Sequence, residues 1–182
     1  LSDVALDRAM LREVKLDGAK LDGLRADQLT MMNVVAVGVS MRRSKMKLGT
    51  FIGCNLDRAD LSESDISETS FFQCTGREAK FEGSQLPNIR IVHECDFVKA
   101  VFARSRMPQT NLRGTKLAGS DFTDCDMPQS DLSAADFTEA TFFRAILRES
   151  LLMDTNFTNA NLRGANMMSV IAHRVVVRGA DV

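Results

Sequence analysis

Several residue types are missing or scarce in this chain of 182 residues, and each scarcity excludes a class of protein. Tryptophan and tyrosine are absent, so the aromatic side chains that most often anchor ligands and interfaces are missing. The longest uncharged stretch, which includes residues 29–41, is too short and too polar to span a bilayer. The formal net charge is −1, which argues against a protein that coats nucleic acid and against a strongly acidic mimic of it.

Residues and motifs typical of catalytic or metal-binding sites are also few. The four cysteines show no CxxC spacing, and the first residues of this sequence do not have the charged-then-apolar pattern of a signal segment, so we expect reduced thiols in a cytosolic type of protein. The two histidines, His93 and His173, lie far apart in the sequence. No phosphate-binding glycine loop and no HExxH motif is present. We therefore expect no catalytic, cofactor-binding or metal-binding residues, and no enzyme.

What the chain does have is an apolar residue at every fifth position, and we call these positions centres. From Leu1 to Val182 there are 37 centres, of which only Gly76 is not apolar. The register slips by one residue between Ile91 and Phe97. With 45% apolar and 26% charged residues overall, such regularity predicts a single folded domain over residues 1–182.

A second pattern runs two residues before each centre, where small residues dominate and all four cysteines fall. Only Leu24, Leu29 and Ile89 are bulky there. One large and one small inward residue per five fits neither the 3.6-residue period of a helix nor the two-residue period of a strand. It fits a chain that turns a corner every five residues. Glycines such as Gly18 and Gly53, two residues after a centre, would suit those corners.

Three runs carry this pattern most clearly: ANLRGAN (160–166), TNLRGTKLAGSDF (110–122) and SDLSAADFTEATF (130–142). They resemble pentapeptide-repeat proteins of the A(D/N)LXX type, and the resemblance covers essentially residues 1–182. It implies an all-β fold, a right-handed quadrilateral parallel β-helix with four repeats per coil. About nine coils at ~4.8 Å each would make a rod about 43 Å long. The motifs Met107-Pro108-Gln109 and Met127-Pro128-Gln129 recur four pentapeptides apart, which independently supports four repeats per coil.

Sorting the centres onto four sides predicts what each side buries and exposes. One side stacks Phe81, Phe102, Phe122 and Phe142 inside. On another, the outward residue after each centre gives an apolar stripe, made of Met32, Ile52, Phe72 and Val92. A contiguous external stripe favours a partner protein or a second copy packed there. It is also compatible with cover by a further segment of a longer chain, or with the scattered apolar residues that any surface tolerates.

Two other stretches depart from the average. Residues 24–50 overfill the small positions with Leu24 and Leu29 and then turn basic, so we expect an irregular coil with a bulge or local loop there. Residues 121–139 hold six acidic side chains and no basic one, which forms an acidic belt about one coil deep. Ordinary solubility explains such a belt better than a specific function does.

The resemblance leaves function open between classes. We expect a rigid, non-enzymatic scaffold for protein–protein interaction, part of a larger bacterial protein because both ends fall within the repeat. Similar repeat regions occur in bacterial secretion-associated adaptors and effectors, including those of type VI secretion. We therefore expect the protein to be cytoplasmic or, if it is part of an effector, translocated. The alternative is a DNA mimic that binds gyrase, as quinolone-resistance members do. Near-neutral charge, no helical extension and no long inserted loop weigh against it.

Overall fold

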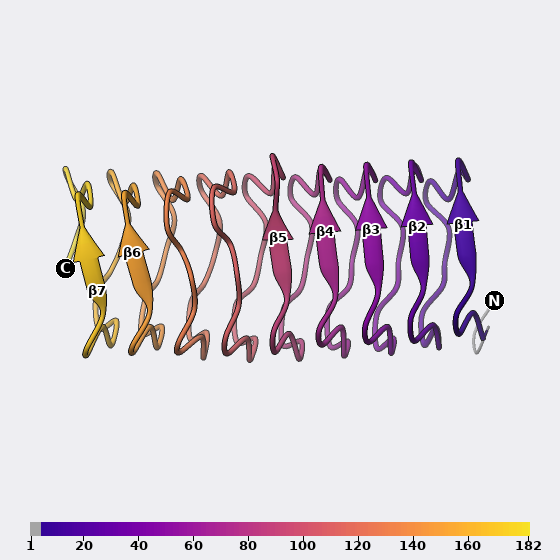
Figure 1. Ribbon diagram of the computed structural model, residues 1–182, viewed down its shortest axis with the longest axis horizontal. Coiled ribbons are helices and arrows are strands. Elements are labelled where there is room, and N and C mark those ends of the chain that lie inside the picture. The colour runs from indigo at the N-terminus through magenta and orange to yellow at the C-terminus, as the bar shows by residue number, and fades with distance from the viewer. Residues whose placement is uncertain (1–4) are drawn as a thin grey trace.

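The computed structural model describes residues 5–182, which fold into a parallel β-solenoid with no helix among them (Figure 1). Its named strands are three residues long: β1 (Met10–Arg12), β2 (Thr30–Met32), β3 (Thr50–Ile52), β4 (Ser70–Phe72), β5 (Arg90–Val92), β6 (Leu151–Met153) and β7 (Ile171–His173). β1 to β5 form one parallel sheet and β6 and β7 another. All of them lie on one side of the rod, which we call the strand face (Figure 1).

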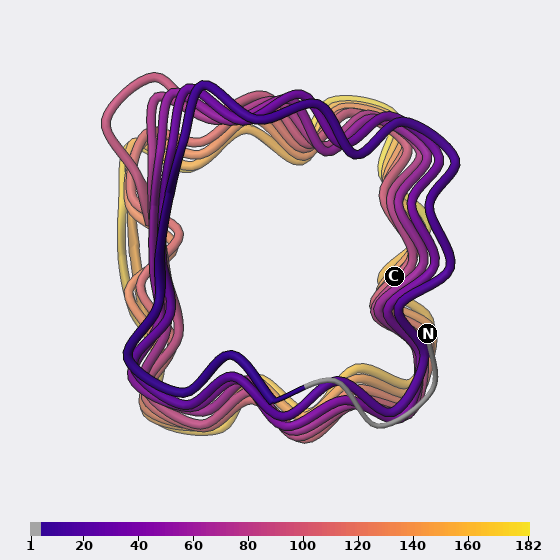
Figure 2. The same ribbon diagram turned by 90° about the vertical axis from the view of Figure 1, so that its right-hand side faces the viewer.

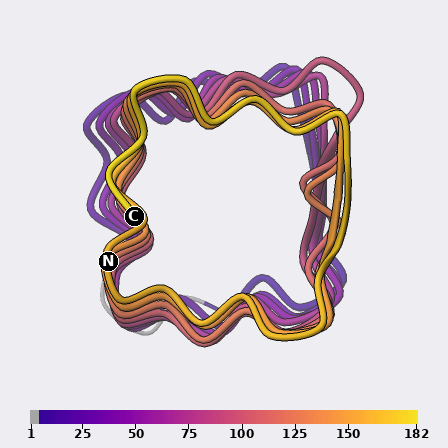
Figure 3. The same cartoon turned by 90° about the vertical axis from the view of Figure 1, so that its left-hand side faces the viewer.

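Viewed along its axis, the solenoid has a square cross-section and a right-handed course (Figures 2 and 3). Thr30 pairs with Thr50 and Thr50 with Ser70, so four pentapeptides make one coil. Eight such steps lead from β1 to β7. The described chain therefore makes about eight turns, slightly fewer than the nine expected, because the residues beyond β1 and β7 complete only parts of a coil.

The corners explain the residue types at the turn positions. Within residues 5–182, every residue two after a centre has positive φ, glycines such as Gly18 (62°) and non-glycines such as Arg58 (57°) alike. At most corners the third residue after the centre donates its N–H to the centre's carbonyl, as Ala19 does to Leu16 at 3.0 Å. This is the pattern of a type II turn, which favours glycine at its third position and proline at its second. Pro87, Pro108 and Pro128 occupy that second position and stack in successive coils.

At many corners the residue before the centre is Asp or Asn, and its side chain accepts a hydrogen bond from the turn. Asp60 accepts the backbone N–H of Ser62 at 3.0 Å, and Asn161 accepts that of Arg163 at 3.1 Å. These N–H groups have no backbone acceptor, so the side-chain oxygen satisfies a donor that would otherwise lack a partner. The recurrent acid or amide of the repeat is thus a turn cap.

The inward residues form regular stacks. Phe81, Phe102, Phe122 and Phe142 are fully buried, and neighbouring rings lie parallel with centroids 4.7–4.9 Å apart. The predicted phenylalanine stack is confirmed. It spans four coils, so each inner ring is packed against the coil above and the coil below.

Three serines in the core form a regular set of hydrogen bonds. The buried hydroxyl of Ser84 accepts the N–H of Ser64 at 3.1 Å and donates to the carbonyl of Leu61 at 2.9 Å. Ser64 and Ser105 repeat this pattern one coil earlier and one coil later. From Ser44 to Ser105 the serines therefore link four successive coils through the interior, and the hydroxyls of Ser64, Ser84 and Ser105 all have partners.

The expectation of an irregular coil at residues 24–50 is wrong. Pairing keeps its regular spacing of four pentapeptides throughout, and Leu24 and Leu29 are 2% and 1% exposed. The physical reason is an exchange of volume. Leu24 and Leu29 lie on either side of the small centre Ala26, and Val34 and Val39 lie on either side of Ala36, so larger residues at the small positions offset smaller centres.

One extra residue interrupts the spacing just after β5. Asp60 pairs with Lys80, four pentapeptides further along the chain, whereas Thr75 pairs with Asp96, one position beyond that spacing. Two successive residues, His93 and Glu94, have positive φ (55° and 65°). The chain loops outward there at one corner of the square (Figures 2 and 3). This bulge borders the strand face.

Candidate interaction surface

The strand face aligns the outward residues of successive strands. Because β1 to β5 pair in register, Arg12, Met32, Ile52, Phe72 and Val92 lie side by side in one column. One coil further on, Asn111 pairs with Arg90 and brings Arg113 to the next place in the same column. The apolar stripe expected from the sequence is therefore four rungs long and has an arginine at each end.

The four residues of the stripe are not equally accessible. Met32, Ile52 and Phe72 are half-buried, but Val92 is only 6% exposed. The expectation that all four face solvent alike is wrong for Val92, which lies beside the bulge. Three residues of the stripe, Met32, Ile52 and Phe72, thus remain accessible to a partner. Val92 is buried beneath the surface at the position that β5 contributes.

Charge is absent from the centre of this face. The outward residues of the coils that carry β2, β3 and β4 are uncharged: Thr30, Met32, Asn33, Thr50, Ile52, Gly53, Ser70, Phe72 and Gln73. No other side has three successive uncharged coils within residues 5–182. A solvated side of a rod has no need to exclude charge, whereas the core of a docking surface does.

A pocket of about 360 Å³ lies where the stripe meets the bulge. The pocket is lined by Arg90, Val92, His93, Glu94, Asn111, Arg113, Gly114 and Ala134. The ring of His93 lies 5.6 Å from that of Phe72, centroid to centroid. Sequence reasoning missed this pocket. The register slip was visible, but the slip alone does not place His93 beside Phe72 or open a space between two arginines.

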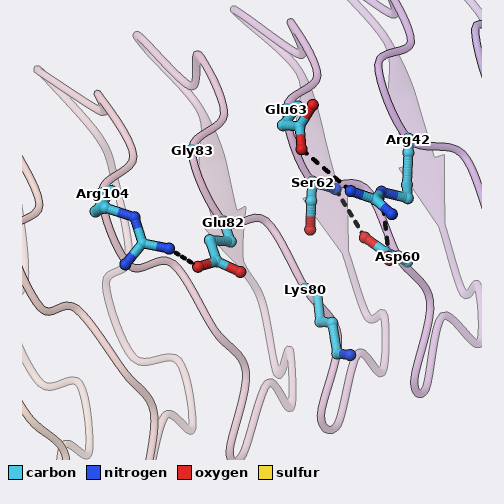
Figure 4. A pocket seen from close by; sticks show the side chains of 8 residues that line it. All are labelled: Arg42, Asp60, Ser62, Glu63, Lys80, Glu82, Gly83 and Arg104. Atoms are coloured by element: carbon cyan, nitrogen blue, oxygen red, sulfur yellow. Dashed lines mark hydrogen bonds and ion pairs between the residues drawn. The ribbon is translucent and has the colours of Figure 1, made fainter.

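The opposite side of the rod holds a second hollow, of about 410 Å³, which is lined mostly by charged residues (Figure 4). Arg42 pairs with Glu63 at 3.1 Å and lies 3.8 Å from Asp60, and Arg104 pairs with Glu82. These ion pairs join neighbouring coils. Because the charges pair with one another, the hollow offers a ligand little unpaired charge, and its side chains serve to tie coils together.

The acidic belt of residues 121–139 is largely occupied by internal contacts. Asp124 pairs with Arg144 at 2.6 Å, and this hydrogen bond lowers the pKa of the Asp124 carboxyl. Asp126 lies 3.8 Å from Arg106. Asp121, Asp131 and Asp136 accept turn N–H groups. Turn caps and arginines of adjacent coils therefore account for most of the belt.

The cysteines are core residues. Cys54, Cys74, Cys95 and Cys125 are free and buried. Hydrogen bonds with Cys54 and Cys95, together with burial, raise the pKa of the Cys74 thiol. Burial raises the pKa of Cys125 to about 12, so this thiol stays protonated. In the described part of the chain, no three His, Cys, Asp or Glu side chains are grouped to hold a metal ion, and no helix is long and apolar enough to cross a membrane.

Comparison with known proteins agrees with this architecture. The sequence profile of pentapeptide repeats matches in eight copies, over residues 51–90, 95–133 and 135–171. The chain belongs to the pentapeptide-repeat family. A search of curated proteins found no match.

Solved structures of QnrB1 share the fold. Full-length QnrB1, a plasmid-mediated fluoroquinolone resistance protein, aligns with a TM-score of 0.68 at 17% identity, over 91% of this chain and 94% of its own. A trypsin-treated form of QnrB1 gives a TM-score of 0.54 at 18% identity, over 91% and 92%. HetL from the cyanobacterium Nostoc sp. strain PCC 7120 aligns over 99% of this chain and 90% of its own at 20% identity, with a TM-score of 0.40. At these identities the similarity to QnrB1 establishes the fold alone.

Proposed function

We propose that this pentapeptide-repeat protein is a non-enzymatic scaffold whose strand face docks a partner protein. The observation that carries the proposal is the uncharged centre of that face, with Met32, Ile52 and Phe72 aligned across three successive coils. Aligned apolar residues lose more unfavourable contact with water on docking than the same residues scattered over a surface.

The hydrogen bonds between successive coils support a docking role for the strand face. The backbone of each coil is hydrogen-bonded to the coils on both sides, so the strand face is held rigid before a partner arrives. A preorganised surface loses little conformational entropy on binding, and more of the contact free energy remains as affinity. In a β-solenoid, repeats contact only their neighbours, so the outer faces are free for such use.

Site-specific photo-crosslinking tests this proposal. A photoreactive amino acid replaces Ile52 on the strand face or, as a matched control, Thr123 on the opposite side. Both residues follow a buried phenylalanine centre and are half-buried. We expect a discrete crosslinked partner from position 52 and none from position 123. Equal crosslinking from both positions, or none from 52, would contradict the proposal.

DNA gyrase is the second candidate partner, and the fold similarity to a fluoroquinolone resistance protein is what favours it. A DNA mimic needs negative potential along its length. Here the acidic belt is engaged by Arg106 and Arg144 and by turn N–H groups, so we rank this function second. Inhibition or protection of purified gyrase in a supercoiling assay would reverse the ranking. Whether the partner belongs to a secretion system follows from the identity of the crosslinked protein.

A further inference from the structure

We infer that the partner segment docked on the strand face is an amphipathic α-helix with acidic residues near both ends, lying along the axis of the rod. This inference rests on the proposed function and specifies the chemistry of its partner. It is drawn from the spacing of the apolar stripe and from the two arginines that bracket it. An extended strand and a second copy of this chain are the competing occupants.

The spacing of the stripe matches a helix. Successive strands lie about 4.8 Å apart, which puts Met32, Ile52, Phe72 and Val92 at about 0, 4.8, 9.6 and 14.4 Å along the rod. Helix residues i, i+3, i+7 and i+10 lie at about 0, 4.5, 10.5 and 15 Å at 1.5 Å per residue. The two series agree within about 1 Å at every rung, and these four helix positions share one face.

An extended strand along the same axis does not match. Alternate side chains of a strand are about 6.6 Å apart, so a strand drifts from the stripe by about 1.8 Å at every rung. Over three rungs the drift is about 5.4 Å, which is a full rung. The outward direction also rules out pairing with the sheet, because the backbone hydrogen bonds of β2, β3 and β4 are already made with neighbouring coils.

The charges fix the chemistry of the two ends. Arg12 and Arg113 occupy the rungs before and after the stripe, about 24 Å apart, and Arg90 lines the same pocket as Arg113. Nε of Arg12 donates to Glu13 at 3.3 Å, and within residues 5–182 its two Nη groups make no hydrogen bond, so they are left to bind a carboxylate. Asp131 lies 3.9 Å from Arg113, a loose ion pair. Glu or Asp near i−4 and i+14 of the helix would reach these guanidinium groups.

The occupant is a partner helix rather than a second copy, because charge complementarity favours the helix. In a second copy the same face has arginine at both ends of its stripe. Arg12, Arg90 and Arg113 would then approach arginines of like charge when two such faces meet. A helix that carries carboxylates at both ends removes this repulsion and forms two ion pairs instead.

Designed peptides test the inference directly. The probe is a fluorescein-labelled 22-residue helix with leucines at i, i+3, i+7 and i+10 and two glutamates at each end. Its twin has lysines in place of the glutamates. In a fluorescence anisotropy titration we expect the glutamate peptide to bind at least about tenfold more tightly than the lysine peptide. Equal affinities, or no binding of either peptide, would overturn the inference.

Three variants locate the binding. Phe72→Glu should weaken binding of the glutamate peptide by at least about tenfold. Phe143→Glu, at the other outward phenylalanine on the opposite side, should leave the affinity unchanged. The double variant Arg12→Glu/Arg113→Glu should reverse the preference in favour of the lysine peptide, a gain that misfolding does not produce. Loss of binding to both peptides in the double variant, or equal loss in the two phenylalanine variants, would overturn the inference.

The failure of this inference is distinguishable from failure of the proposed function. If position 52 crosslinks a partner but the peptides bind without charge preference, the docking surface stands and the acidic helix is wrong. If position 52 crosslinks nothing, the docking surface itself is wrong. Analytical ultracentrifugation of the protein alone tests whether a second copy of the chain binds the strand face. A dimer that Phe72→Glu dissociates would show that the occupant is a second copy and not a partner helix.

Discussion

The ring of Phe97 fills the space above Gly76. A Cβ atom added to Gly76 would lie 2.7 Å from Cδ1 of that ring and closer still to Cε1, which no real structure allows without movement. Gly76 is the one centre that is not apolar, and Phe97 is the centre of the same side in the next coil. The phenylalanine therefore supplies the volume that the glycine lacks, and the core stays continuous across the bulge.

This relationship predicts that Gly76→Ala destabilises the protein. The added methyl group overpacks a buried site, for which the expected loss in the free energy of unfolding is about 1–3 kcal/mol. Urea denaturation measures it. The double variant Gly76→Ala/Phe97→Leu should lose less than the sum of the two single variants, because the smaller side chain makes room. Simple additivity would show that the two sites are independent.

The positive φ at the corners predicts that exchanging glycine and alanine there changes stability in opposite directions. Gly83 has a φ of 66° with no atom within 4 Å of an added Cβ, so Gly83→Ala imposes only the backbone cost of about 1 kcal/mol. Ala134 has a φ of 57° at an equivalent corner, and Ala134→Gly should raise stability by up to about 1 kcal/mol. Thermal unfolding of both variants checks the pair. A change of the same sign in both would contradict the turn assignment.

The hydrogen bonds of the buried serines predict that alanine substitution of two equally buried serines, Ser84 and Ser133, has unequal effects on stability. Ser84→Ala leaves the N–H of Ser64 and the carbonyl of Leu61 without a partner, which should cost about 1–3 kcal/mol. The hydroxyl of Ser133 has no partner among residues 5–182, so Ser133→Ala should be neutral or slightly stabilising. Chemical denaturation of the two variants measures the difference. Equal losses of unfolding free energy in the two variants would mean that the hydrogen bonds of Ser84 do not stabilise the protein.

One ion pair should make stability depend on pH. Asp96 accepts Nη2 of Arg77 at 2.7 Å and Nε at 3.1 Å, and these bonds lower the pKa of the Asp96 carboxyl below its usual value. A lowered pKa means that the stabilisation is complete above the unfolded value of about 3.9 and is lost as the pH falls further. The Tm difference between wild type and Asp96→Asn should therefore be largest near neutral pH and shrink below about pH 4. A difference that does not vary with pH would exclude the ion pair as its source.

Much of the fold was accessible from the sequence because one physical constraint repeats. A corner every five residues demands a large inward centre such as Phe102 and a small residue such as Ala100, with a residue tolerant of positive φ two places on. Few other folds satisfy that demand. The regularity of residues 24–50 depends on pairs of neighbouring positions, because Leu24 and Leu29 fit only together with the small centre Ala26 between them.

The candidate surface was accessible only in part. The period of four pentapeptides places Met32, Ile52 and Phe72 in one column, and the structure aligns them in that way. The burial of Val92 and the pocket between Arg90 and Arg113 depend on how the extra residue at the bulge is accommodated. That outcome is a three-dimensional packing result, and a slip in register does not specify it.

We propose above that the strand face binds a protein partner. Capture from a lysate of the source organism tests it, with wild type, Phe72→Glu and Phe143→Glu as three matched baits and circular dichroism to verify that each is folded. We expect one set of proteins that wild type and Phe143→Glu retain and that Phe72→Glu loses. Retention of the same proteins by folded Phe72→Glu would contradict it.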